Sequence, residues 1–248
     1  MGSGSFSSAP LDLELKSNEI HIWCAGLEQP LSRLQQFFEL LNEDERLRAE
    51  RFHFEPDRRR FVSRRGMLRT ILGRYLKTDS RELEFHHGSH GKPALACTAQ
   101  KVPIHFNLSH SRCFALFGFT REHPIGVDIE HVHDIPEMEN IAERFFSVKE
   151  HEAFLSLPRE LKIRAFFHSW TCKEAFVKAT GEGLSRPFDR FHVSVDPGEP
   201  ARLLGIEGDS REASRWMIRD FSPVPGYVCA FAVESHRLEA RRWRWEAT

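Results

Sequence analysis

The stretch Gly126-Val127-Asp128-Ile129-Glu130 places two acidic residues inside an apolar run. A strand turns successive side chains to opposite faces, so Asp128 and Glu130 would project from the same face. Carboxylates arranged in this way are the oxygen ligands that Mg²⁺ takes from a protein. The pair would equally suit an exposed strand edge, so the metal site needs support from elsewhere in the chain.

That support comes from Trp170-Thr171-Cys172-Lys173-Glu174-Ala175-Phe176-Val177-Lys178, which has helical spacing. Trp170, Glu174 and Lys178 recur every four residues and would form one stripe, with Lys173 beside it. An ordinary surface ion pair between Glu174 and Lys178 would explain part of this pattern. Together with the two acids of the first segment, however, the stripe indicates a clamp for a divalent cation that holds a phosphate ester.

The 248 residues are 40% hydrophobic and 29% charged, which is ordinary for a soluble globular protein. No apolar run approaches the roughly 18–20 residues of a membrane span, and the first residues lack a signal-peptide pattern. The cysteines never form a C-x-x-C pair, which favours reduced thiols at Cys24, Cys97, Cys113, Cys172 and Cys229. We therefore expect a cytoplasmic protein that does not bind a membrane.

The net charge of −1 conceals an uneven distribution. Residues 46–74 carry ten arginines against three acids, whereas residues 126–160 carry nine acids against three bases. This asymmetry suits a polyanion and a cation held between two parts of the molecule. A nucleic acid is the alternative partner for the arginine run. It is disfavoured because the chain is neutral in total and its aromatic residues are not interleaved with the arginines.

Hydrophobic periodicity predicts a structural unit that occurs twice. In the first half the predicted elements are a strand at 20–24, helices at 31–41, 42–51 and 61–76, and a hairpin at 104–119. In the second half they are a strand at 125–130, a long helix at about 159–179, strands at 191–195 and 201–206, and a hairpin at 216–233. Asn42 and Glu45 have the spacing of a helix capping box.

The repeated unit predicts an α+β fold of two similar α/β half-domains, related by a pseudo-twofold axis with a ligand cleft between them. We assign 1–18 to a flexible N-terminus, 19–122 to the N-terminal half and 123–248 to the C-terminal half, which would carry the metal site. Two halves in one chain favour a monomer. The basic, aromatic tail at 237–245 is interpreted as a surface-packed end.

Two smaller motifs contain histidines. Ser109 and His110 fall in the predicted tip of the first hairpin, where contact with a phosphate is the better functional interpretation. A Ser–His nucleophile is rejected because adjacent residues rarely have productive geometry and no G-x-S-x-G occurs. His131 and His133 leave zinc as an alternative to magnesium, although their spacing differs from that of usual zinc ligands.

In order, and over most of the chain, these segments resemble the surfactin-synthetase-activating type of 4′-phosphopantetheinyl transferase. The matching segments are Arg-Phe-x-Phe-x-x-Asp57-x-x-Arg60, Gly91-Lys92-Pro93, Asn107-Leu-Ser109-His110-Ser111, Gly126-Val-Asp128-Ile-Glu130 and Trp170-x-x-Lys173-Glu174-Ala-x-x-Lys178. The last three are specific as a set, and the first two are supportive.

The resemblance implies two similar halves, a coenzyme A site between them and a requirement for Mg²⁺. Enzymes of this family transfer the phosphopantetheine arm of coenzyme A to a serine of an apo acyl, peptidyl or polyketide carrier protein. They release adenosine 3′,5′-bisphosphate.

Matched residue by residue, the family pattern also assigns roles. The metal ligands would be Asp128, Glu130 and Glu174. The 3′-phosphate and adenosine end would be held by Arg48, Arg60, Lys92, Ser109 and His110. The pyrophosphate would be reached by Lys173 and Lys178. Arg48 matches a basic position of the N-terminal helix, whereas the basic position before it is occupied by Glu45.

Phosphoryl transfer requires neutralisation of charge and removal of the serine proton. Lys178 would stabilise the developing charge, and Glu174 is the candidate base, acting directly or through water.

Two alternatives to the transferase function stay open. One is a Mg²⁺-dependent phosphoanhydride hydrolase that needs no protein acceptor. The other is a binding module whose basic face docks an acidic helical partner.

Overall fold

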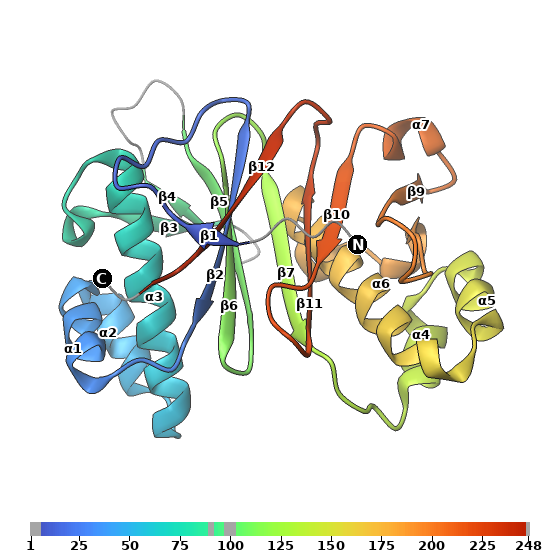
Figure 1. The fold of residues 1–248 in the computed structure, drawn as a ribbon, viewed down its shortest axis with the longest axis horizontal. Helices are drawn as coiled ribbons and strands as arrows, with labels where there is room; N and C mark the ends of the chain where they lie inside the picture. Colours follow the sequence, from blue (N-terminus) through green and yellow to red (C-terminus); the bar gives the residue numbers. More distant parts are fainter. Residues whose placement is uncertain (1–5, 89–91, 97–102, 247–248) are drawn as a thin grey trace.

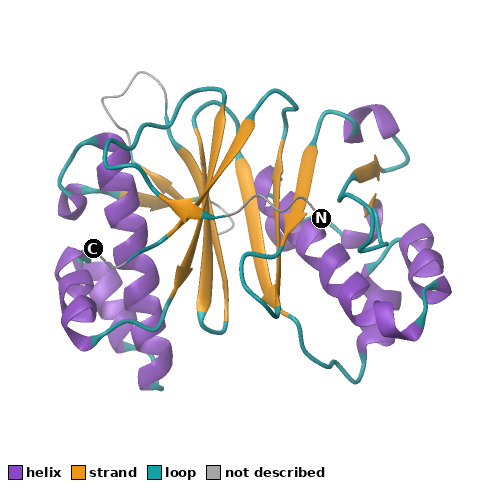
Figure 2. Cartoon of the chain, viewed as in Figure 1, coloured by secondary structure: helices purple, strands orange, loops and turns teal. Residues whose placement is uncertain are grey.

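The computed structural model describes residues 6–88, 92–96 and 103–246 of the chain. Helices cover the two outer sides of the molecule, and strands fill its middle (Figure 1). Figure 2 shows the same layers by type of secondary structure. Strands from both halves contribute to one apolar cluster in the middle, so two sheets face each other there.

The N-terminal half begins with a strand, continues through three helices and ends in a hairpin. Its main elements are β2 (Glu19–Gly26), α1 (Leu31–Leu40), α2 (Glu43–Glu50), α3 (Glu55–Leu76), β5 (His105–Ser111) and β6 (Phe114–Thr120). Between α3 and β5 lie the short elements η1 (Ser80–Glu82), β3 (Phe85–His87) and β4 (Pro93–Leu95). The predicted capping box of Asn42 and Glu45 begins α2.

The C-terminal half follows the same order. It begins with β7 (Ile125–His131), α4 (Met138–Phe145), α5 (Val148–Ser156) and α6 (Arg159–Thr180). It continues with η2 (Gly183–Ser185), η3 (Phe188–Arg190), β8 (Phe191–Val193), β9 (Leu203–Ile206), α7 (Ser210–Ala213), β10 (Met217–Phe221) and β11 (Tyr227–Val233). Helix α6 ends where Gly181 adopts a left-handed φ of 76°.

The main elements of the two halves correspond. Each contains a first strand, two short helices, a helix of 22 residues and an antiparallel hairpin. One hairpin strand pairs with the first strand in each half, which gives the corresponding orders β5-β6-β2 and β10-β11-β7. The predicted α+β fold of two similar halves is therefore confirmed.

The first hairpin turns later than the sequence predicts. Strand β5 continues through Ser111, and the turn is formed by Arg112 and Cys113, where Arg112 has a φ of 47°. The prediction that Ser109 and His110 lie at the hairpin tip is therefore wrong. Serine favours turns through local hydrogen bonds, but here the serine hydroxyls bond to the other half of the molecule.

Both ends of the chain also differ from the predicted boundaries. Leu13 and Leu15 are buried in the N-terminal core, so this part of the segment predicted to be flexible is packed. Strand β12 (Glu239–Arg244) pairs in parallel with β2, and β1 (Ser7–Ser8) pairs with β12. Trp243 packs against the N-terminal core, which explains why this strand leaves the C-terminal half.

None of the helices in the described parts of the chain combines the length and apolar character needed to cross a membrane.

Helix α6 crosses β7 in direct backbone contact at Gly126. A Cβ atom at this position would overlap Ala175 O and Ala179 N. Only glycine permits such a close approach of helix and strand. The crossing brings the polar stripe of α6 beside Asp128, two residues further along β7.

We expect Gly126→Ala to destabilise the protein by at least about 2 kcal/mol, because the helix and the strand must move apart. Chemical denaturation followed by circular dichroism measures this change. The control is Gly26→Ala in β2, where the nearest atom to an added Cβ is 4.0 Å away. Equal stability of the two variants would contradict the proposed close crossing.

Candidate active site

Polar side chains of β5 join the two halves of the molecule. Strand β7 is the outer strand of its sheet, and β5 is the outer strand of the N-terminal sheet. Asn107 Oδ1 accepts a hydrogen bond from the backbone N–H of Val127, with an N–O distance of 2.9 Å. This contact begins a series that we call the seam ladder, which consists of Asn107, Ser109 and Ser111.

The serines of the seam ladder hold the two predicted metal ligands of β7. Ser109 Oγ donates a hydrogen bond to Asp128 Oδ1 at 2.8 Å. Ser111 Oγ donates to Glu130 Oε2 at 2.8 Å and accepts from the His131 amide at 3.1 Å. The two carboxylates are thereby fixed on the side of β7 that faces the other half.

Lys178 completes a polar cluster where β5 meets β7, a contact between the two halves that we call the seam. Its Nζ atom lies 2.6 Å from Asp128 Oδ1, 3.1 Å from Ser109 Oγ and 3.7 Å from Glu174 Oε2. Asp128 is buried, and its second oxygen, Oδ2, has no hydrogen-bond partner among the described residues. One carboxylate oxygen is therefore left for a further positive group.

Burial and neighbouring charges shift the pKa values of the cluster. Burial, followed by the charge of Asp128, raises the pKa of Glu130 above its usual range. Burial also raises the pKa of Glu174, although Lys178 opposes that shift. Burial would lower the pKa of Lys178, but the charges of Asp128 and Glu174 outweigh it and raise that pKa. Three carboxylates thus share one ammonium group.

The carboxylates are near one another but do not form a finished metal cage. In the part of the chain that the structure describes, no three His, Cys, Asp or Glu side chains are arranged to hold a metal ion. Asp128 Oδ1 instead accepts a hydrogen bond from Lys178 Nζ. His131 and His133, the residues of the zinc alternative, stack on each other with ring centroids 6.2 Å apart.

A basic cavity of about 250 Å³ lies next to the polar cluster. Its lining residues are Phe52, Asp57, Arg60, Phe61, Arg64, His110 and Arg112. His110 lies between Ser109 and Ser111 of the seam ladder in β5, so this cavity adjoins the seam. The structure brings together Arg60 and His110, which the sequence predicts to hold the same end of the ligand.

Arg64 and Arg112 line the basic cavity, although neither was predicted from the sequence to have a role. Arg64 follows Arg60 by one helical turn in α3, which is the signal that could have revealed it. Its Nε atom is buried without a hydrogen-bond partner among the described residues, and burial lowers its pKa to about 10. Arg112 reaches the cavity from the late turn of the hairpin.

Three other predicted ligands of the adenosine end do not line the basic cavity. Ser109 bonds to Asp128 and Lys178 instead. Arg48 lines a neighbouring cavity that shares Phe52 with the basic cavity, and its guanidinium lies 5.6 Å from the centre of the Phe61 ring. Lys92 does not line either of these two cavities. Its Nζ atom donates hydrogen bonds to the carbonyls of Lys178 and Ile125 in the other half.

Lys173 does not lie in the site, and the prediction that it reaches a pyrophosphate is wrong. Its side chain is fully buried, and Nζ lies 2.8 and 2.7 Å from the two oxygens of Glu150. The third hydrogen bond goes to Phe191 O at 2.8 Å. Every N–H of the ammonium group is thus used inside the C-terminal core, and loss of either partner would leave the other charge buried and unpaired.

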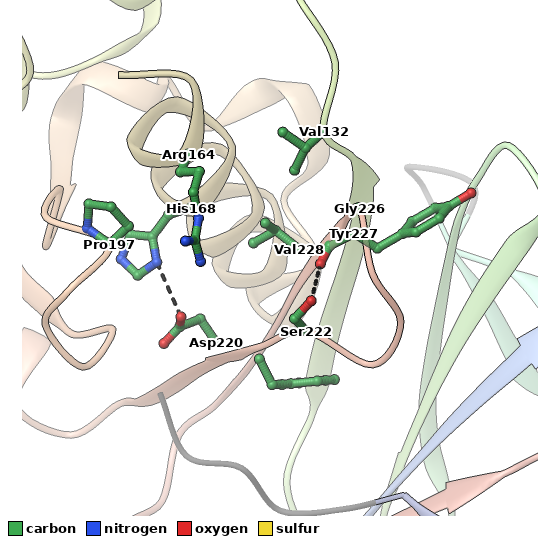
Figure 3. Close-up of a pocket in the computed structure, with 10 residues that line it drawn as sticks. Val132, Arg164, His168, Pro197, Asp220, Ser222, Gly226, Tyr227 and Val228 are labelled. Atoms are coloured by element: carbon green, nitrogen blue, oxygen red, sulfur yellow. Dashed lines mark hydrogen bonds and ion pairs between the residues drawn. The ribbon is translucent and has the colours of Figure 1, made fainter. Parts of the chain in front are cut away.

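A separate cavity of about 250 Å³ contains none of the predicted site residues (Figure 3). It lies between α6 and the ends of β10 and β11. In it, His168 Nδ1 is 3.3 Å from Asp220 Oδ2, and Ser222 Oγ donates to Tyr227 O at 2.6 Å. His168 Nε2 is buried without a hydrogen-bond partner among the described residues. None of the residues that line this cavity belongs to the polar cluster around Asp128, so we do not include them in the candidate active site.

Comparison with known proteins gives a consistent result for both halves. Residues 124–232 match the family model of the 4′-phosphopantetheinyl transferase superfamily, and residues 29–118 match the model of the 4′-phosphopantetheinyl transferase N-terminal domain. The chain is 38% identical over 236 residues to the 4′-phosphopantetheinyl transferase HetI of Nostoc sp., covering 95% of this chain and 96% of the relative. The chain belongs to the 4′-phosphopantetheinyl transferase family. It is therefore a transferase.

A second relative is the 4′-phosphopantetheinyl transferase Sfp of Bacillus subtilis, with 32% identity over 210 residues, 82% of this chain and 89% of the relative. Among solved structures, the holo-[acyl-carrier-protein] synthase of Thermotoga maritima has a TM-score of 0.36 and 24% identity. That match covers 45% of this chain and 62% of the other.

The basic cavity leads to a prediction for His110. Partial burial of its ring, followed by the charge of Arg64, lowers its pKa to about 4. An unfolded histidine has a pKa near 6.5, so His110 should destabilise the fold progressively as the pH falls from about 6.5 to about 4. Above that window it is neutral and has no such effect.

Titration of the imidazole by NMR measures the pKa directly. We expect a value of about 4 in the free protein. Sulfate, whose charge is constant in this range, should raise it by occupying the basic cavity. A pKa near 6.5 without sulfate, or a value that sulfate leaves unchanged, would contradict the placement of His110 among the arginines of this cavity.

Proposed function

We propose that this protein transfers the 4′-phosphopantetheine group of coenzyme A to a serine hydroxyl of an apo acyl, peptidyl or polyketide carrier protein. The reaction depends on Mg²⁺ and releases adenosine 3′,5′-bisphosphate. The observation that carries this proposal is the polar cluster around Asp128 beside a cavity lined by three arginines. Membership of the transferase family supports the same chemistry.

The basic cavity is suited to the 3′-phosphate of coenzyme A. Guanidinium groups recognise phosphate through planar, paired N–H donors, and Arg60, Arg64 and Arg112 line this cavity. The buried, unpaired Nε of Arg64 is a donor that a phosphate oxygen would satisfy. Arg48 lines the adjoining cavity and would serve the adenosine end.

The acidic residues of the seam fit a magnesium ion. Asp128, Glu130 and Glu174 would hold it, because carboxylate oxygens are the ligands that Mg²⁺ prefers. Asp128 Oδ2 is buried and unpaired, and both glutamates carry raised pKa values that a cation would relieve. When bound, the ion would supply positive charge to the diphosphate oxygens of coenzyme A.

The chain's own residues account for the remaining steps. Lys178, held by Asp128 and Ser109, would stabilise negative charge that develops on the departing phosphate. Glu174 would accept the serine proton while the serine oxygen bonds to the β-phosphorus and the bond to the adenosine bisphosphate oxygen breaks.

The acceptor protein would approach the arginine-rich side of the seam. The segment 46–74 carries ten arginines against three acids, and positive charge attracts an acidic carrier. We also expect the enzyme to act as a cytoplasmic monomer without a nucleic acid partner.

The test is incubation with coenzyme A, Mg²⁺ and a panel of apo carrier proteins, followed by mass spectrometry. One carrier should gain the mass of a single phosphopantetheine group, and removal of Mg²⁺ with a chelator should prevent the gain. Release of adenosine 3′,5′-bisphosphate without a carrier would instead favour the phosphoanhydride hydrolase. Salt-sensitive carrier binding without any covalent product would favour the binding module.

We expect Asp128→Asn and Glu174→Gln each to lower the transfer rate by at least about 100-fold, since each removes a charge that acts on the diphosphate or the serine proton. The matched control is Glu152→Gln, an exposed residue of α5 that should leave the rate unchanged. Near-normal transfer by either site variant, in a folded protein, would rule out the proposed role of that carboxylate.

A further inference from the structure

Lys92 connects the N-terminal half to two backbone carbonyls of the C-terminal half. Its Nζ atom donates a hydrogen bond to Lys178 O at 2.6 Å and another to Ile125 O at 3.1 Å. Lys92 immediately precedes β4, so the contact crosses from the small β3–β4 sheet to the start of β7 and the end of α6. Burial in this position lowers the pKa of Lys92 to about 8.

Both acceptors lie at positions that control the polar cluster. Lys178 is in the last turn of α6, where backbone carbonyls lack partners within the helix and attract a positive group. Ile125 directly precedes Gly126, at which α6 and β7 touch. Lys92 therefore fastens the helix to the strand at the point where their distance determines how Lys178 meets Asp128.

We propose that Lys92 is a positioning residue that fixes the main chain of Lys178, and not a ligand of the coenzyme A 3′-phosphate. This inference rests on the proposed transferase function, because it assigns Lys92 a part in the same reaction. Two of the three N–H donors of Lys92 are committed to carbonyls, and its side chain does not line the basic cavity. Lys92 acts on catalysis through the backbone that carries Lys178.

The kinetic test compares Lys92→Met with Arg60→Met, a variant of a residue that lines the basic cavity. A positioning role predicts that Lys92→Met lowers kcat about 10- to 100-fold, because small misplacements of a catalytic group are costly. The KM for coenzyme A should change by less than about twofold. Arg60→Met should show the opposite pattern, with a raised KM. Lys92→Arg, which keeps the N–H donors, should recover part of the lost kcat.

A second measurement does not depend on turnover. Hydrogen exchange of the amides at 174–181 should be faster in Lys92→Met than in the wild type, since the last turn of α6 loses its anchor. Affinity for adenosine 3′,5′-bisphosphate, measured by calorimetry, should be unchanged in Lys92→Met and weakened in Arg60→Met. A folded Lys92→Met protein with weakened binding and normal exchange would overturn the positioning role.

The outcomes separate this inference from the proposed function. If the wild type modified no carrier, the transferase proposal would fail, whereas the exchange and binding measurements would still test the anchor. If the wild type modified a carrier and Lys92→Met raised only the KM for coenzyme A, the phosphate-ligand role would be correct. Unchanged kcat, KM and exchange would show that the contact has no influence on the site, which also overturns the proposal.

Discussion

The two halves of this protein meet at two outer strands that are joined by side chains. An unpaired strand edge exposes backbone N–H and C=O groups, which must find partners when another element covers them. The seam ladder supplies partners for the N–H groups of Val127 and His131, and its serines also bind Asp128 and Glu130. The interaction that joins the halves therefore also sets the positions of the acidic side chains.

Packing of α6 on the face of β7 that carries Asp128 makes this arrangement possible. Gly126 lets α6 touch the strand, which brings Lys178 into contact with Asp128 and concentrates three carboxylates around one ammonium group. Burial raises the pKa values of the two glutamates, so keeping these carboxylates charged is costly to the folded protein. Such a cost is expected at a site that binds a cation and a polyphosphate. Stability and function thus make opposite demands on the same few residues.

Periodicity predicted much of the fold, because local patterns determine local structure. The strand around Asp128, the long helix ending at Gly181 and the capping box of Asn42 all follow from neighbouring residues. The late turn after Ser111 does not, since contacts with β7 override the turn preference of serine. The return of β12 to the N-terminal sheet likewise depends on packing between distant segments.

The candidate site was predictable to a similar extent. The stripe of Glu174 and Lys178 faces the seam as the helical spacing indicates, and Arg60 and His110 share one cavity. Helical spacing could not show that Lys173 lies outside the site, because its partner Glu150 is 23 residues earlier in the chain.

The most direct test of the seam is hydrogen exchange at the Val127 amide in the wild type and in Asn107→Ala. Because its N–H points to Asn107, we expect slow exchange in the wild type and exchange about 10-fold faster or more in the variant. An amide that exchanges rapidly in the wild type, or that is indifferent to the loss of Asn107, would contradict the role of the seam ladder in joining the halves.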